Sequence, residues 1–181
     1  MDAALPHTPT GGTPAPRSLR GMLLRALAFV LVFMALQAGW ENARGSWVER
    51  LWVHRLTVHS ATLVINLLTP EVKAVPQGAR IVAPGGGLNV LFGCEGTDSV
   101  FLLTAALLVF PLPLRLRLTG LLAGLAWVFA LNQLRIVALF YAFRSDSRLF
   151  DLLHTTAAPL LMVVLTGLFF QLCLQRAAAS R

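Results

Sequence analysis

Three side chains with nucleophilic, cationic or proton-carrying chemistry lie at or within apolar stretches of this chain. Cys94 lies between two glycines in Gly93-Cys94-Glu95-Gly96, just before the apolar run 99–114. Arg135 and His154 each fall inside a later apolar stretch. Polar groups are costly in hydrocarbon and usually mark function where they occur. The question is whether the elements of the chain can bring these three side chains to one site.

The surroundings of Cys94 both favour and oppose formation of a thiolate. The thiolate is the reactive form of cysteine, and the N-terminus of a helix favours negative charge. Glu95 and Asp98 oppose it, because nearby negative charges raise the pKa of a thiol. Activation would therefore need a neighbouring cation such as Arg135 or His154. A cysteine buried without a chemical role is the alternative.

Arg135 and His154 each have a suitably spaced polar neighbour. Asn132 and Arg135 share a helix face at i, i+3, so an amide and a guanidinium could together hold an oxyanion or a substrate carboxylate. Asp151 precedes His154 by three residues, a spacing at which a carboxylate can orient an imidazole. The alternatives are an arginine that extends to the membrane interface and a histidine in a structural hydrogen bond.

The composition excludes an ordinary soluble domain. Hydrophobic residues make up 56% of the chain, charged residues 13%, and the mean hydropathy is +0.71, which indicates an integral protein of the lipid bilayer. The net charge of +7 does not indicate nucleic-acid binding, because the basic residues separate apolar runs instead of forming one patch. Cys94 and Cys173 fall at opposite ends of predicted helices, so no disulfide is expected. His54 and His59 are poorly aligned for a shared metal, and we predict no metal or cofactor.

The predicted fold class is an all-α polytopic membrane protein with about four transmembrane helices, an interfacial helix and a small extracytoplasmic β-hairpin. Residues 1–18 are rich in proline, glycine and threonine, which predicts a disordered cytoplasmic tail. The membrane domain is predicted to cover residues 19–176, followed by a cytoplasmic tail at 177–181. Four apolar segments are near the ~20 residues that a helix needs to cross the hydrocarbon: 21–40, 96–114, 118–143 and 150–174. A signal peptide cleaved after Ala38 is the alternative for the first segment, although the site lacks a small residue two positions earlier.

The region between the first two spans has mixed polarity. Residues 51–68 are amphipathic and end before Pro70, which predicts an interfacial helix. The β-prone runs 79–83 and 88–92 flank Pro84-Gly85-Gly86-Gly87, a pattern that predicts a hairpin leading directly to Cys94.

Arginines at the ends of the apolar segments indicate the orientation in the membrane. The Arg115/Arg117 turn and the arginine-flanked ends of the chain place both termini in the cytoplasm, although a raw count of basic residues does not decide the orientation. The outer ends of the last three spans then meet at one membrane face. At about 1.5 Å rise per residue, Arg135 lies roughly two turns and His154 roughly one turn from the outer end of its helix. Similar depth predicts that both can approach Cys94.

The order of these motifs resembles the exosortase/archaeosortase family. Gly93-Cys94-Glu95-Gly96, then Asn132-Gln133-Leu134-Arg135-Ile136, then His154 each stand at the outer end of a predicted span, and the similarity covers residues 20 to 175. The chain resembles most the short exosortases of Gram-negative bacteria, and among these the exosortase H group. One departure is Thr155-Thr156-Ala157-Ala158-Pro159 after the histidine, which lacks the glycine often found there.

The resemblance implies a membrane-embedded cysteine peptidase or transpeptidase of the inner membrane, with its active site facing the periplasm. Cys94 would be the nucleophile, Arg135 would hold the oxyanion and His154 would carry protons. Its partners would be exported membrane proteins with a C-terminal sorting signal, composed of a short motif, a transmembrane helix and a basic tail. Both hydrolysis and transpeptidation remain open. Three further polar residues near these positions are candidates for substrate binding: Asn132, Glu95 and Asp98.

A non-enzymatic polytopic membrane protein is the alternative class. A small permease or an assembly scaffold would place polar residues along a path across the bilayer, and the cytoplasmic halves of the later spans carry almost none. A haem- or quinone-linked subunit would use His54, His59 and His154 as ligands, but only His154 lies well within a predicted span.

Overall fold

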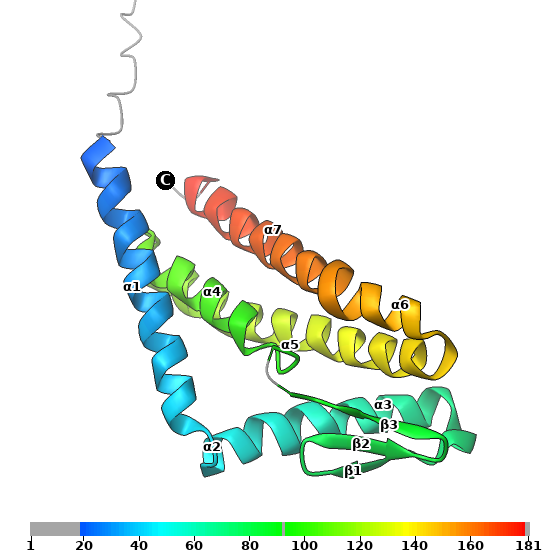
Figure 1. Cartoon of the computed structure of the whole chain (residues 1–181). Coiled ribbons are helices and arrows are strands. Elements are labelled where there is room, and N and C mark those ends of the chain that lie inside the picture. The colour runs from blue at the N-terminus through cyan, green and yellow to red at the C-terminus, as the bar shows by residue number, and fades with distance from the viewer. Residues whose placement is uncertain (1–18, 92, 180–181) are drawn as a thin grey trace, which may run out of the picture.

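The structure is a computed structural model that describes residues 19–91 and 93–179 (Figure 1). Three helices are long and apolar enough to cross a membrane: α1 (Leu19–Ala43), α5 (Leu114–Ser145) and the continuous helix Ser147–Ala179. The last comprises α6 (Ser147–Leu152), the π-helical turn η3 (Leu153–Ala157) and α7 (Ala158–Ala179). The predicted mostly α-helical, multi-pass membrane class is confirmed. The predicted tail 1–18 lies outside the described residues, and the helix extends into the segment 177–181 that was predicted as a tail.

The fourth apolar helix, α4 (Thr97–Val109), is shorter than predicted. Its 13 residues rise about 20 Å, whereas the hydrocarbon core is about 30 Å thick. The helix ends because Phe110 adopts an extended conformation and Pro111 and Pro113 cannot continue a helix. By length, three helices rather than four therefore qualify as spans in the part of the chain that the structure describes.

A helix and a small sheet fill the region between α1 and α4. α2 (Trp47–Glu49), η1 (Arg50–Val58) and α3 (His59–Leu68) form one helical segment that stops before Pro70, as predicted; the turn η2 (Pro70–Val72) follows. The predicted hairpin corresponds to β2 (Arg80–Ala83) and β3 (Gly86–Asn89), which pair antiparallel. An additional strand, β1 (Val75–Gln77), pairs with β2. It was not predicted because three residues around a proline lack the alternation that marks a strand.

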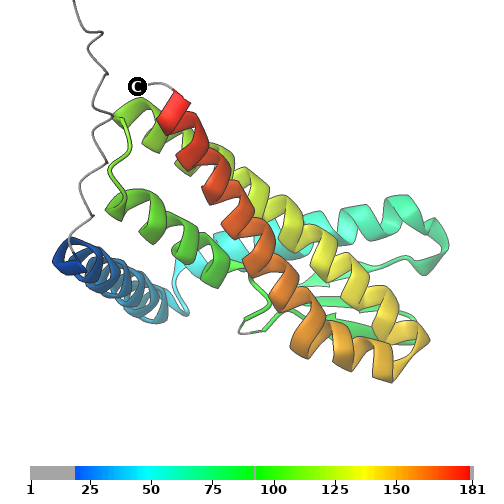
Figure 2. The same cartoon turned by 90° about the horizontal axis from the view of Figure 1, so that it is seen from above.

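The elements form two packed groups (Figures 1 and 2). α4, α5 and α7 pack together, and α1 lies against α4. On another side of α5, α3 and β3 cover the half of this helix that carries the predicted site residues. Each group has its own buried core; the first contains Leu103, Leu107, Val128 and Met162, and the second contains Val58, Ile65, Ile81 and Phe140.

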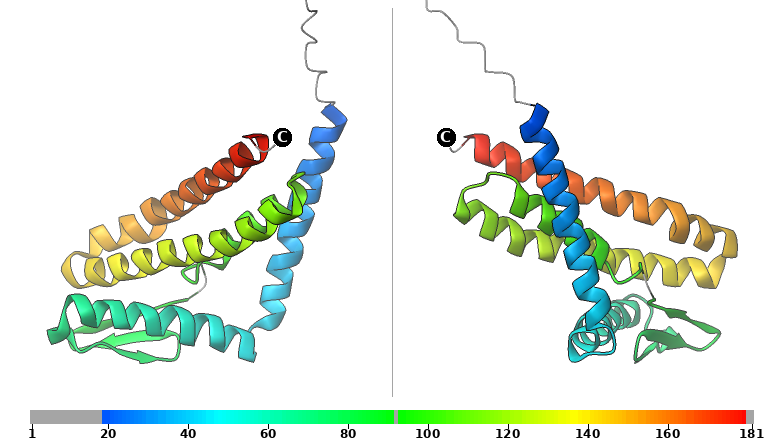
Figure 3. Two further views of the ribbon diagram at one scale, coloured as in Figure 1. Left: turned by 180° about the vertical axis from the view of Figure 1, so that it is seen from behind. Right: turned by 60° about the vertical axis from the view of Figure 1, so that its left-hand side comes forward.

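The two ends of the molecule differ in charge and in structure (Figure 3). The start of α1, the turn between α4 and α5 and the end of α7 lie at one end. The layer of α3 and the sheet, together with the turn between α5 and α6, lies at the other. Five arginines belong to the first end: Arg20, Arg25, Arg115, Arg117 and Arg176.

Candidate active site

Cys94 lies in the loop between β3 and α4, and two glycines shape that loop. Gly93 has φ +79° and Gly96 has φ +78°, in the left-handed region that glycine adopts readily. The Cys94 N–H donates to the Leu91 carbonyl at 2.9 Å, which closes a turn. The residue is only 5% exposed, so the loop encloses the thiol. α4 begins at Thr97, three residues after Cys94.

The structure brings the three predicted catalytic side chains together. The Sγ atom of Cys94 lies 3.6 Å from Nδ1 of His154 and 3.8 Å from Nη2 of Arg135. The other terminal nitrogen of Arg135, Nη1, donates to the Gly93 carbonyl at 2.8 Å. One guanidinium therefore holds the loop and faces the sulfur at the same time.

The electrostatic surroundings disfavour a permanent thiolate. Burial raises the pKa of the Cys94 thiol, the Arg135 cation lowers it, and the Glu95 carboxylate raises it again. Burial is the largest of these effects. A thiol with a raised pKa is mainly protonated at neutral pH, so a base must accept its proton during attack. Nδ1 of His154 is at hydrogen-bonding distance for that transfer.

A π-helical turn presents His154. Pro159 has no N–H and crowds the carbonyl four residues earlier, which distorts the helix; the Ala158 N–H bonds instead to the carbonyl of Leu153. The imidazole stacks on the Phe150 ring, with centroids 5.4 Å apart and planes 5° from parallel.

The predicted orienting role of Asp151 is not seen. No hydrogen bond or ion pair joins its carboxylate to His154 in the described part of the chain, and the aspartate is exposed. The π-turn changes the i, i+3 alignment on which that prediction depended.

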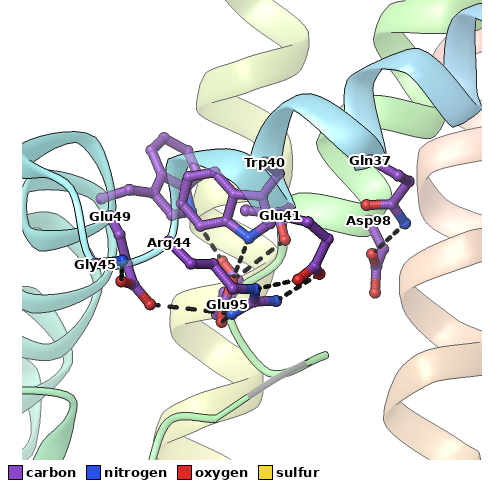
Figure 4. A network of polar contacts seen from close by, with 10 residues as sticks. Gln37, Trp40, Glu41, Arg44, Gly45, Glu49, Glu95 and Asp98 are labelled. Atoms are coloured by element: carbon purple, nitrogen blue, oxygen red, sulfur yellow. Dashed lines mark hydrogen bonds and ion pairs between the residues drawn. The ribbon is translucent and has the colours of Figure 1, made fainter.

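Glu95, a predicted substrate-binding residue, belongs to a polar network at the end of α1 (Figure 4). Its carboxylate is 3% exposed and accepts hydrogen bonds from Trp40 Nε1 at 2.9 Å and from Arg44 Nη1 at 3.3 Å. Its carbonyl accepts from Trp52 Nε1 at 3.1 Å. Because these partners belong to the protein itself, they indicate that Glu95 supports the structure beside the nucleophile.

Sequence reasoning did not identify Trp40, Arg44 and Trp52 as parts of the site. They lie 43 to 55 residues before Glu95, and only the folded chain brings them together. One signal was available. A carboxylate that is buried next to a nucleophile needs donors, and the C-terminal end of α1 supplies Trp40, with Arg44 directly after the helix.

The other two predicted substrate-binding residues occupy different places. Asp98 is exposed in the first turn of α4 and accepts a hydrogen bond from Gln37 at 2.8 Å. With Gly93 it lines a cavity of about 480 Å³ between α1 and α4. Asn132 is 2% exposed and lies against Gly96, where an added Cβ would be 2.8 Å from its Cγ. Neither polar atom of its amide has a protein partner among the described residues.

A second cavity, of about 610 Å³, lies between α1, α4 and α7. Its lining is apolar except for Arg25 and Thr166. Within residues 19–91 and 93–179, no cluster of three or more His, Cys, Asp or Glu side chains is arranged as a metal site.

Comparison with known proteins identifies one family. The model of the transmembrane exosortase (EpsH) family matches residues 17–171, a stretch that contains Cys94, Arg135 and His154. No curated protein and no solved structure matches the chain significantly. The match covers most of the chain and agrees with the resemblance in motif order. This protein therefore belongs to the transmembrane exosortase family.

Proposed function

We propose that this protein is a membrane-embedded cysteine peptidase or transpeptidase that cleaves the C-terminal sorting signals of exported membrane proteins. The observation that carries the proposal is the position of the Cys94 sulfur, 3.6 Å from a His154 nitrogen and 3.8 Å from an Arg135 nitrogen. Membership of the exosortase family supports the class of reaction. The protein would lie in the inner membrane with this site facing the periplasm.

The arrangement suits nucleophilic catalysis by a thiol. His154 Nδ1 accepts the thiol proton while Cys94 attacks the peptide carbonyl, and it then returns that proton to the leaving amine as the C–N bond breaks. Arg135 stabilises negative charge on the sulfur and then on the carbonyl oxygen. The product is a thioester on Cys94. Attack by water completes hydrolysis, and attack by an acceptor nucleophile completes transpeptidation.

The cavities suggest how a membrane-anchored substrate reaches the thiol. The apolar cavity of about 610 Å³ is lined by α1, α4 and α7 and could receive the membrane helix of a substrate. The smaller cavity lies nearer the C-terminal end of α1 and the N-terminal end of α4, and it reaches Gly93, next to the nucleophile. A helix in the first cavity would direct the segment that precedes it, which carries the short motif, toward Cys94. Asp98 could then contact the substrate near the cleaved bond.

The test is to co-express candidate substrates that carry C-terminal sorting tails and to follow their size in membranes. Cys94→Ala should abolish cleavage while the protein remains in the membrane. Cys173→Ala is the matched control, because this second free cysteine lies in the core of α4, α5 and α7. Equal cleavage by the Cys94 variant would contradict the proposal.

A further inference from the structure

We propose that Arg44 and Glu95 form a charge pair that controls the reactivity of Cys94, with Arg44 compensating the carboxylate beside the nucleophile. Both are positioning residues, since they act through the thiol and need not touch the substrate. The catalytic consequence rests on the function proposed above. The effect on the thiol itself can be measured without any substrate.

The geometry requires a compensating charge at this place. Glu95 directly follows Cys94 and is 3% exposed, and a buried carboxylate without partners is strongly disfavoured. Arg44 Nη1 approaches Oε1 at 3.3 Å, and Trp40 Nε1 donates to Oε2 at 2.9 Å. Of these two donors, only the arginine brings a positive charge. Its hydrogen bond to Glu41 raises the pKa of Arg44, so this residue stays protonated.

The two tryptophans fix the position of Glu95 independently of Arg44. Trp40 holds the carboxylate and packs edge-on against Phe101, with ring centroids 6.4 Å apart. Trp52 holds the backbone carbonyl of Glu95 and packs edge-on against Phe129, with centroids 6.2 Å apart. Loss of Arg44 would therefore leave the carboxylate in place, and its uncompensated charge would oppose formation of the thiolate.

The other charged groups near the thiol either face the sulfur or pair with residues other than Glu95. Arg135 from α5 and His154 from η3 face the sulfur directly. Three further acidic groups lie on α1, α2 and α4; Glu41 and Glu49 pair with Arg44, and Asp98 accepts from Gln37. Within the described chain, Arg44 is the cation that forms an ion pair with Glu95.

The experiment measures the rate of maleimide labelling of Cys94 against pH, in membranes that contain the full-length Cys173→Ala protein. Arg44→Gln should move the labelling midpoint to higher pH by about one unit, the usual scale for one nearby charge. Glu95→Gln should move it to lower pH. In the double variant the effect of Arg44→Gln should largely disappear, because the carboxylate beside the thiol is no longer there to be compensated. Arg44→Lys should keep the midpoint close to its normal value, since it keeps the charge.

A matched control and an activity measurement complete the test. Arg50→Gln removes a nearby arginine whose Nη1 bonds the Gly45 carbonyl, and it should leave the midpoint unchanged. Substrate cleavage by Arg44→Gln should recover at higher pH, which a damaged fold would not allow. An unchanged midpoint in Arg44→Gln, or the same shift with and without Glu95, would overturn this inference. If Arg44→Gln shifts the labelling midpoint but the protein with Arg44 intact cleaves no candidate substrate, the proposed function is contradicted and this inference is not.

Discussion

The guanidinium of Arg135 reaches two groups that a single ammonium could not hold together. Nη1 donates to the Gly93 carbonyl and Nη2 approaches the Cys94 sulfur. Arg135→Lys keeps the charge but loses the planar set of donors, so we expect substrate cleavage to fall by about 10²-fold, the cost of losing one such donor. The measurement is cleavage in membranes at equal protein abundance.

Arg144→Lys is the matched control for this substitution. Arg144 lies on the same helix and donates to the carbonyl of Pro84 at 2.8 Å, away from the thiol. Its lysine variant should cleave substrate at nearly the normal rate. Full activity in Arg135→Lys would show that this arginine supplies charge alone.

His154 should matter more for cleavage than for the reactivity of the thiol. His154→Ala removes the group that returns a proton to the leaving amine, whereas maleimide labelling needs only the thiolate. Burial raises the pKa of Cys94, so the thiolate fraction, and with it the residual cleavage by His154→Ala, should increase as the pH rises. Asp151→Asn is the control and should behave normally, because this carboxylate does not contact the imidazole. Equal losses of labelling and cleavage in His154→Ala would remove the proton-carrier role.

At the level of elements, the loop before α4 depends on its glycines to different degrees. Alanine at Gly93 would meet no atom within 4 Å and would suffer only from its positive φ, whereas alanine at Gly96 would also press on Asn132. Strain of this kind costs about 1–3 kcal/mol, so both variants should lower the thermal stability in detergent, Gly96→Ala more than Gly93→Ala. Asn132→Ala should recover part of the additional loss. Equal destabilisation by the two alanines would show that the contact with Asn132 is unimportant.

The cavity between α1, α4 and α7 can be tested by filling it. An added Cβ at Gly167 would meet no atom within 4 Å, and the residue lines the cavity. Gly167→Phe should therefore leave the fold intact but reduce cleavage of membrane-anchored substrates. Gly39→Phe is the control, because Gly39 is also a helical glycine with open space around it and does not line this cavity. Normal cleavage by Gly167→Phe would place the substrate helix elsewhere.

Most elements could be predicted from the sequence because their signals are local. Long apolar runs predict α1, α5 and α7, and glycines after a proline predict the turn between β2 and β3. The length of α4 was overestimated because the apolar run continues to Leu114, although Pro111 is a signal that the helix ends at the preceding residue. The π-turn at His154 was missed for a related reason. A proline within a helix predicts a distortion but not which neighbouring residues it realigns.

At the scale of the whole molecule, the site was predictable only in outline. Equal depth in the membrane was enough to predict that Cys94, Arg135 and His154 could approach one another, because depth follows from position along each helix. The contacts of Glu95 with Arg44 and Trp40 depend on how α1 packs against α4. Neither periodicity nor spacing specifies that packing.

The arrangement of arginines over the whole molecule leads to the last prediction, which concerns its orientation. The start of α1, the α4–α5 turn and the end of α7 lie at one end, with Arg20, Arg117 and Arg176 among their residues. Arginine near membrane helices favours the cytoplasmic side. Reporters fused after Arg117 and after the C-terminus should therefore read as cytoplasmic.

A reporter fused after Arg80, in the small sheet, should read as periplasmic, because this layer lies at the opposite end of the molecule. The same experiment tests the proposed function. Cys94 directly follows the sheet. A cytoplasmic Arg80 would therefore place the thiol in the cytoplasm, the compartment that exported substrates have already left. A periplasmic Arg80 together with a cytoplasmic Arg117 would place α4 between the two compartments although it has only 13 residues. The bilayer beside α4 would then have to be thinned, or α4 would have to be shielded from lipid by α1 and α7.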